Sequence, residues 1–168
     1  MKILIISLPR TGSTSLLYKL GEEKKLQIIF EPWDGSERFK YDSNMDNCCL
    51  KTMIFQSPES NYLKYHEKLH KEFDEVILLS RKNLKECSES WAYLKHHNHK
   101  DFDSTKPYVW KTPPNIEKHA DDIYKWNEEL IQLSKSLNVD ITYYEDIFDE
   151  NSDERYRKNI ILDKNKLI

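Results

Sequence analysis

Hydroxyl side chains and one arginine gather in the segment LPRTGSTSLL, residues 8–17, which follows a short apolar run. The segment contains Gly12, one of only three glycines in the chain. A strand, a tight glycine-containing turn and a helix point several backbone N–H groups at one anion, and the helix dipole adds positive charge there. We therefore predict an anion-binding loop with these contributors: Arg10, Thr11, Gly12, Ser13, Thr14 and Ser15.

The loop differs from the loops that bind nucleoside triphosphates. Those loops read GxxxxGK[ST], with the lysine on the β- and γ-phosphates and the hydroxyl on Mg²⁺. This chain lacks both the first glycine and the lysine, so ATP hydrolysis is disfavoured. An ordinary helix N-terminus with Ser and Thr caps is the alternative interpretation of the segment.

A second group of anion ligands follows another predicted strand, in VILLSRKNLKECSESWAYL, residues 76–94. The strand ends at Arg81 and Lys82, and the next helix carries Ser88 and Ser90. Two anion sites at neighbouring strand ends suit a ligand that is phosphorylated at two positions, such as a 3′,5′-bisphosphorylated adenosine. A basic pair on the surface with incidental serines is the alternative.

Together these segments resemble the PAPS-dependent sulfotransferases, whose sulfuryl donor is 3′-phosphoadenosine-5′-phosphosulfate (PAPS) and whose product is PAP. LPRTGSTSLL looks like the 5′-phosphosulfate loop of the carbohydrate and bacterial glycolipid branches, and RKNLKECSESW resembles the 3′-phosphate motif. Three further segments are similar to family elements and stand in the family's order: FEPWDG (30–35), LKTMI (50–54) and ITYYEDIF (141–148).

The resemblance implies how the donor is bound. Arg10 and the amides and hydroxyls of the loop would hold the 5′-phosphosulfate, and Arg81 with Ser90 would hold the 3′-phosphate. The family's usual interval of eight residues leads from Lys82 to Ser90, whereas from Arg81 it leads to Glu89, which would repel phosphate. We prefer the register that ends at Ser90, with Ser88 as the second choice.

The resemblance also implies catalytic residues. Glu31 stands at the end of the second predicted strand, where a carboxylate can take the proton of an acceptor hydroxyl; its alternative roles are to orient the loop or simply to precede the turn at Pro32. Lys51, on the third predicted strand, would neutralise the transferring group or bind the acceptor, and a surface lysine is its alternative. We assign Glu31, Arg10 and Lys51 as the candidate catalytic residues.

These assignments predict an enzyme that moves a sulfuryl group from PAPS to a hydroxyl of a sugar or small metabolite, without a metal. A P-loop kinase and a degenerate, non-catalytic module that binds a nucleotide or a partner are the alternatives. His66 and His70 read HExxH, but no third ligand is evident, so a zinc-protease helix is disfavoured. The acceptor and the oligomeric state are left open.

Composition restricts the partners and the compartment. A net charge of −3 argues against general binding to nucleic acids or anionic membranes, and no apolar run is long enough to span a bilayer. The cysteines Cys48, Cys49 and Cys87 have neither metal-ligand spacing nor an even number, which favours a reducing cytoplasm.

The positions of these motifs depend on the predicted fold. Apolar runs at 2–8, 26–30, 49–55, 76–80 and 139–144 are typical of buried strands, and amphipathic stretches at 13–20, 60–72, 83–96 and 117–137 predict helices. Gly21 is the expected stop of the first helix. Alternating strands and helices predict one three-layer α/β domain over residues 1–168, with a parallel sheet and a P-loop-like nucleotide-binding topology, whose ligand lies at the carboxyl ends of the strands.

Overall fold

The computed structural model describes residues 1–34, 40–96 and 116–148. In chain order its elements are β1 (Lys2–Ser7), α1 (Ser13–Lys24), β2 (Gln27–Phe30), β3 (Cys48–Met53), α2 (Tyr62–Leu69), the 3₁₀ turn η1 (His70–Glu72), β4 (Glu75–Ser80), α3 (Leu84–His96), α4 (Ile116–Leu137), β5 (Ile141–Tyr143) and α5 (Tyr144–Ile147).

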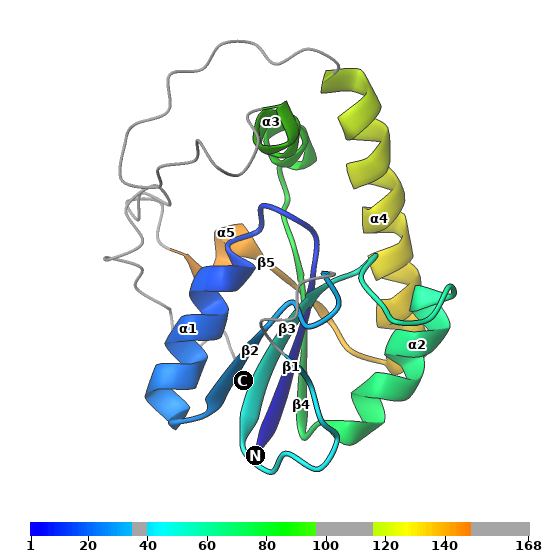
Figure 1. Ribbon diagram of the computed structural model, residues 1–168. Coiled ribbons are helices and arrows are strands. Elements are labelled where there is room, and N and C mark those ends of the chain that lie inside the picture. The colour runs from blue at the N-terminus through cyan, green and yellow to red at the C-terminus, as the bar shows by residue number, and fades with distance from the viewer. Residues whose placement is uncertain (35–39, 97–115, 149–168) are drawn as a thin grey trace.

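The described strands form one sheet of five parallel strands in the order β2-β3-β1-β4-β5 (Figure 1). Helix α1 covers one face of the sheet, and α2 and α4 cover the other. The predicted three-layer α/β fold, with a parallel central sheet and P-loop-like topology, is therefore confirmed. Because all strands are parallel, the segments that leave β1, β2, β3 and β4 emerge at the same edge of the sheet.

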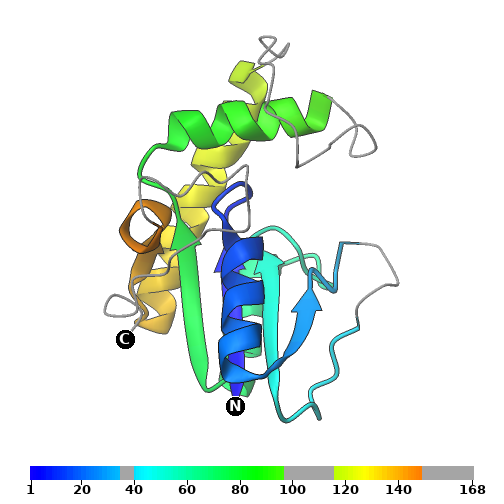
Figure 2. The ribbon, with the colours of Figure 1, turned by 90° about the vertical axis from the view of Figure 1, so that its left-hand side faces the viewer.

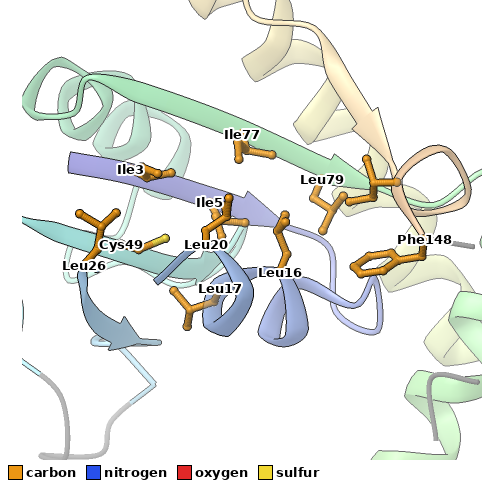
Figure 3. Packing of buried hydrophobic residues seen from close by; sticks show 11 residues of the cluster. Ile3, Ile5, Leu16, Leu17, Leu20, Leu26, Cys49, Ile77, Leu79 and Phe148 are labelled. Carbon is orange, nitrogen blue, oxygen red and sulfur yellow. The ribbon is translucent and has the colours of Figure 1, made fainter. Parts of the chain in front are cut away.

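Strand β1 lies between β3 and β4, and it is buried on both faces because helices cover each side of the sheet. Successive side chains of a strand point to opposite faces. Ile3 and Ile5 pack under α1 against its apolar stripe (Figure 3), whereas Leu4 and Ile6 join the cluster below α2 and α4. This explains why the run KILIIS has no alternating polar residues.

Most predicted elements are confirmed, with ends that shift by a few residues. The predicted helix at 60–72 is divided, because α2 ends at Leu69 and the chain continues as the 3₁₀ turn η1.

One boundary prediction is wrong, because Gly21 does not end the first helix. Helix α1 continues to Lys24, and Lys25 closes it with a left-handed φ of 54° and an N–H that donates to the carbonyl of Glu22. A Cβ atom at Gly21 would lie 2.7 Å from Cγ1 of Ile28. The glycine therefore allows a close approach of α1 to β2, which local sequence could not reveal.

We predict that Gly21→Ala destabilises the protein by about 1–3 kcal/mol, the usual cost of overpacking. In an Ile28→Ala background the clash is gone, so the same change should be neutral or stabilise by up to about 1 kcal/mol through helix propensity. Urea unfolding of the four proteins measures this. Equal costs of Gly21→Ala in both backgrounds would contradict the packing explanation.

Candidate functional site

The loop between β1 and α1 begins at Leu8, whose N–H donates to the carbonyl of Leu79 at the end of β4 (3.1 Å). Arg10 (φ 62°) and Gly12 (φ 69°) both have left-handed backbones, and the residue between them does not. Turns that alternate right- and left-handed residues can gather backbone N–H groups into a concavity that binds anions, so this backbone is compatible with the predicted role of the loop. At Gly12 a Cβ would lie 2.9 Å from the rings of both Tyr144 and Phe148, so only glycine fits there.

The hydroxyl residues of the loop have different environments. Thr11 is buried, and its hydroxyl donates to the carbonyl of Leu8 (2.9 Å), so this side chain shapes the loop. Ser13 begins α1 and is 4% exposed, while Thr14 and Ser15 are half-buried. The first helical hydrogen bond runs from the N–H of Leu16 to the carbonyl of Gly12 (3.1 Å). The amides of residues 13–15 precede that bond and have no acceptor within the helix.

Helix α3 crosses above this loop at the carboxyl edge of the sheet (Figure 2). Nε of Arg10 donates to Oγ of Ser90 (2.8 Å), and a terminal nitrogen of Arg81 donates to the carbonyl of Arg10 (3.3 Å). The thiol of Cys87 donates to the carbonyl of Pro9 (3.1 Å). The structure therefore joins the two predicted anion motifs through Arg10.

The two candidate serines of α3 differ in position. Oγ of Ser88 donates to the carbonyl of Leu84 in the preceding turn (2.8 Å), and the residue is 1% exposed. Ser90 instead reaches the loop through Arg10. From the sequence we expected Ser90 to act with Arg81 at the 3′-phosphate and Arg10 to act at the 5′-phosphosulfate. In the structure Ser90 contacts Arg10.

Arg81 lies among carboxylates that were not among the predicted site residues. Its guanidinium is 3.1 Å from Oε2 of Glu86 and 3.7 Å from Oε1 of Glu145, and it stacks over the ring of Tyr144 at 4.8 Å. The carboxylate of Glu145 also accepts from the N–H groups of Lys82 (2.9 Å) and Asn83 (3.1 Å). Glu145 thus stabilises the start of α3. No sequence signal linked it to Arg81, because the two residues are far apart in the chain.

Glu31 and Lys51 form a buried ion pair at the carboxyl ends of β2 and β3. Nζ of Lys51 donates to Oε1 of Glu31, and the two side chains are 2% and 9% exposed. The N–H of Glu31 donates to the carbonyl of Lys51 (2.8 Å), and Glu31 has a left-handed φ of 43°. The alternative of a surface lysine at Lys51 is therefore wrong.

Gln56 completes this pair, and sequence reasoning missed it. Its Oε1 accepts from the N–H of Met53 (2.9 Å), which leaves Nε2 to donate to Oε2 of Glu31 (2.9 Å). Each oxygen of the Glu31 carboxylate thereby has a fixed donor. Nothing in the sequence distinguishes Gln56 from an ordinary turn residue after a strand.

Burial is the main electrostatic influence on Lys51 and lowers the pKa of its ammonium group. The Glu31 carboxylate raises that pKa and so opposes burial, while the positive charge of Arg10 lowers it further. The effect of Arg10 is evidence that the loop and the Glu31–Lys51 pair share one electrostatic environment.

The HExxH motif spans the end of α2 and the start of η1, and its first histidine has a structural role. Nε2 of His66 lies 3.0 Å from the carbonyl of Ile54 and must carry the proton to donate there, which leaves Nδ1 buried without a hydrogen-bond partner. Among the described ranges, no three or more His, Cys, Asp or Glu side chains are grouped so as to hold a metal ion. Likewise, none of the helices within those ranges has the length and apolar character needed to cross a membrane.

Neither the protein-family models nor the curated proteins contain a match to this chain. Among solved structures, the chain is similar to the YorR protein of Bacillus subtilis, determined in complex with phosphorylated GDP. The two share 11% sequence identity and a TM-score of 0.45, over 85% of this chain and 84% of the other. Similarity at this level identifies no ligand for the present chain.

We predict strong coupling between Glu31 and Lys51 in stability. Glu31→Gln or Lys51→Met leaves one buried charged partner without its counterpart, and each should cost about 3–5 kcal/mol. The double variant removes both charges and should cost less than the sum by at least about 2 kcal/mol. Urea denaturation of the native protein, the two single variants and the double variant gives the double-mutant cycle. Strictly additive losses of stability would contradict a buried, coupled pair.

We also predict that His66 makes stability depend on pH. Burial lowers its pKa from 6.5 to about 4, so between these values the unfolded chain binds a proton that the folded chain does not. Stability should therefore rise by up to about 3 kcal/mol as pH increases from 4 to 6.5.

The test compares His66→Gln with the native protein by urea denaturation across this pH range. Glutamine keeps a donor for the carbonyl of Ile54 but does not titrate, so the variant should lose this part of the pH dependence. The half-buried His70, changed to glutamine, is the matched control. Parallel curves for native protein and His66→Gln would show that His66 titrates normally.

Proposed function

We propose that this chain is a PAPS-dependent sulfotransferase that moves a sulfuryl group to a hydroxyl of a sugar or small metabolite. The observation that carries the proposal is the series of contacts Arg81–Arg10–Ser90, in which Arg81 donates to the Arg10 carbonyl and Arg10 donates to Ser90. It brings together the two motifs that resemble the 5′-phosphosulfate loop and the 3′-phosphate motif of that family.

The loop is suited to the phosphosulfate group. The amides of residues 13–15 at the start of α1 and the guanidinium of Arg10 are donors that favour a compact anion. In sulfuryl transfer the bond between sulfur and the bridging oxygen breaks, and PAP leaves with the electron pair. Arg10 would stabilise the charge that develops on that oxygen, as preorganised cations do in phosphoryl transfer.

Glu31 and Lys51 are suited to the acceptor side of the reaction. As the acceptor oxygen forms its bond to sulfur, its proton would pass to the Glu31 carboxylate, whose orientation is set by Lys51 and Gln56. The Lys51 ammonium would also offset negative charge on the sulfuryl oxygens. Both residues stand at the same edge of the sheet as Arg10. Strand β3, which carries Lys51, lies between β2, which precedes Glu31, and β1, which precedes the donor loop.

A non-catalytic nucleotide-binding module is the second candidate, and a specific observation favours it. Each Glu31 oxygen already accepts a hydrogen bond, from Lys51 or from Gln56, and the residue is only 7% exposed. In a non-catalytic module this carboxylate would hold the ends of β2 and β3 together without taking part in a reaction. A measurement of sulfuryl transfer distinguishes the enzyme from the module.

We predict that adenosine 3′,5′-bisphosphate raises the melting temperature of the protein more than ADP or ATP with Mg²⁺ does. The reason is that only the bisphosphate carries phosphates for both predicted anion sites. A thermal-shift titration with the three ligands measures this. Stabilisation by ATP with Mg²⁺ alone would contradict the proposal and favour a kinase.

The matching turnover experiment supplies ³⁵S-labelled PAPS with a mixed metabolite extract. The native protein should produce labelled product, and Glu31→Gln should produce little while still binding the bisphosphate. The folded fraction of the variant is measured by circular dichroism, because the substitution also weakens the fold. Tight donor binding by the native protein without any labelled product would favour the module.

A further inference from the structure

Arg81 is a buried cation that two carboxylates share. Its side chain is 8% exposed, and its guanidinium is 3.1 Å from Glu86 and 3.7 Å from Glu145. Charges interact more strongly in such partly buried surroundings than in water. A phosphate that approaches Arg81 therefore meets a guanidinium whose positive charge is already neutralised by the carboxylates of Glu86 and Glu145.

The two carboxylates differ in how firmly they are held. Glu145 is 30% exposed and accepts from two backbone N–H groups, at Lys82 and Asn83, so its displacement would leave the start of α3 without these bonds. The side chain of Glu86 is 53% exposed. Besides Arg81, its carboxylate contacts only the side-chain amide of Asn83 among the described hydrogen bonds, at a long 3.4 Å. Glu86 can move into solvent at little cost, whereas Glu145 cannot.

Glu86 also has an ordinary structural role that must be separated from its charge. Asn83 immediately precedes α3 and caps it, because its Oδ1 accepts from the N–H of Glu86 (3.1 Å). Glu86 therefore lies in the first turn of the helix. The N–H of Asn83 donates to Glu145, so the Glu86 carboxylate closes no capping box, and the cap bond uses only the backbone N–H of Glu86. Glu86→Gln therefore retains the local helix geometry and removes only the negative charge.

We infer that Glu86 occupies, in the ligand-free protein, the position on Arg81 that a second phosphate of the ligand takes, and that it thereby determines specificity. A dianionic phosphate held by Arg81 repels Glu86, which turns into solvent as the phosphate binds. A ligand without that phosphate leaves the Arg81–Glu86 pair in place and gains nothing from Arg81. This inference rests on the proposed function, because that proposal supplies the ligand with two phosphates.

The test measures dissociation constants by isothermal titration calorimetry for adenosine 3′,5′-bisphosphate and for AMP, which lacks the 3′-phosphate. Glu86→Gln should bind the bisphosphate about fivefold more tightly than the native protein, as expected for the loss of one partly exposed ion pair, and AMP with a change below about twofold. Glu22→Gln, an exposed site on α1, makes the same change in net charge and should alter neither constant. An unchanged or weaker affinity for the bisphosphate, or an equal gain for AMP, would overturn the inference.

A second comparison shows whether Glu86 acts through Arg81. In an Arg81→Gln background, Glu86→Gln should no longer improve bisphosphate binding; a retained improvement would contradict the inference. If Arg81→Gln does not fold, the inference is still tested by comparing how Glu86→Gln changes the affinities for AMP and for the bisphosphate.

The outcomes also distinguish this inference from the proposed function. Tighter bisphosphate binding by Glu86→Gln without sulfuryl transfer by the native protein would sustain the inference and contradict the enzyme. Sulfuryl transfer by the native protein, without tighter bisphosphate binding by Glu86→Gln, would support the enzyme and contradict the inference. If neither protein binds the bisphosphate, both fail.

Discussion

The position of β1 at the centre of the sheet is the constraint on which the candidate site depends. From Ile3 to Ser7 every residue is buried, and the strand pairs with β3 on one side and β4 on the other. The loop that follows must leave the sheet between the ends of these two neighbours. Lys51 on β3 and Arg81 after β4 therefore flank the loop, although they lie far from it in the sequence. The meeting of three motifs at one edge follows from the strand order and the parallel direction of the strands.

Charge at this edge is organised in pairs that include carboxylates. Lys51 is matched by Glu31, and Arg81 is matched by Glu86 and Glu145. Buried cations without such partners would shift their pKa or destabilise the fold. The carboxylates thus let the ligand-free protein hold several cations close together. Under the proposed function, an anion that binds at this edge would have to compete with these carboxylates, so its affinity would depend on which carboxylate can move.

The sequence predicted the fold well because the information was local. The continuous apolar run of β1 and the helical spacing on α4 each specify an element, and their alternation specifies a parallel sheet. The close approach at Gly21 could not be predicted, since it depends on Ile28, a residue of another element. For the site, the sequence located Glu31, Lys51, Arg10 and Ser90 but gave neither their partners nor their burial. Gln56 and Glu86 were missed, and the link between Glu145 and Arg81 was not foreseen, because these contacts arise only in the tertiary structure.

Helix α5 has a consequence for the order in which the protein matures. Tyr144 and Phe148 cover Gly12, and Glu145 holds the start of α3, so a segment near residue 148 supports a loop that begins at residue 8. During translation, the strands β1 to β4 can pair as they leave the ribosome, since each has its neighbour by residue 80. The loop obtains its covering only after more than sixty further residues have been synthesised. A nascent chain would therefore possess most of its sheet well before its loop is covered, and truncated translation products would retain most of the strand pairing but lack the residues that cover the loop.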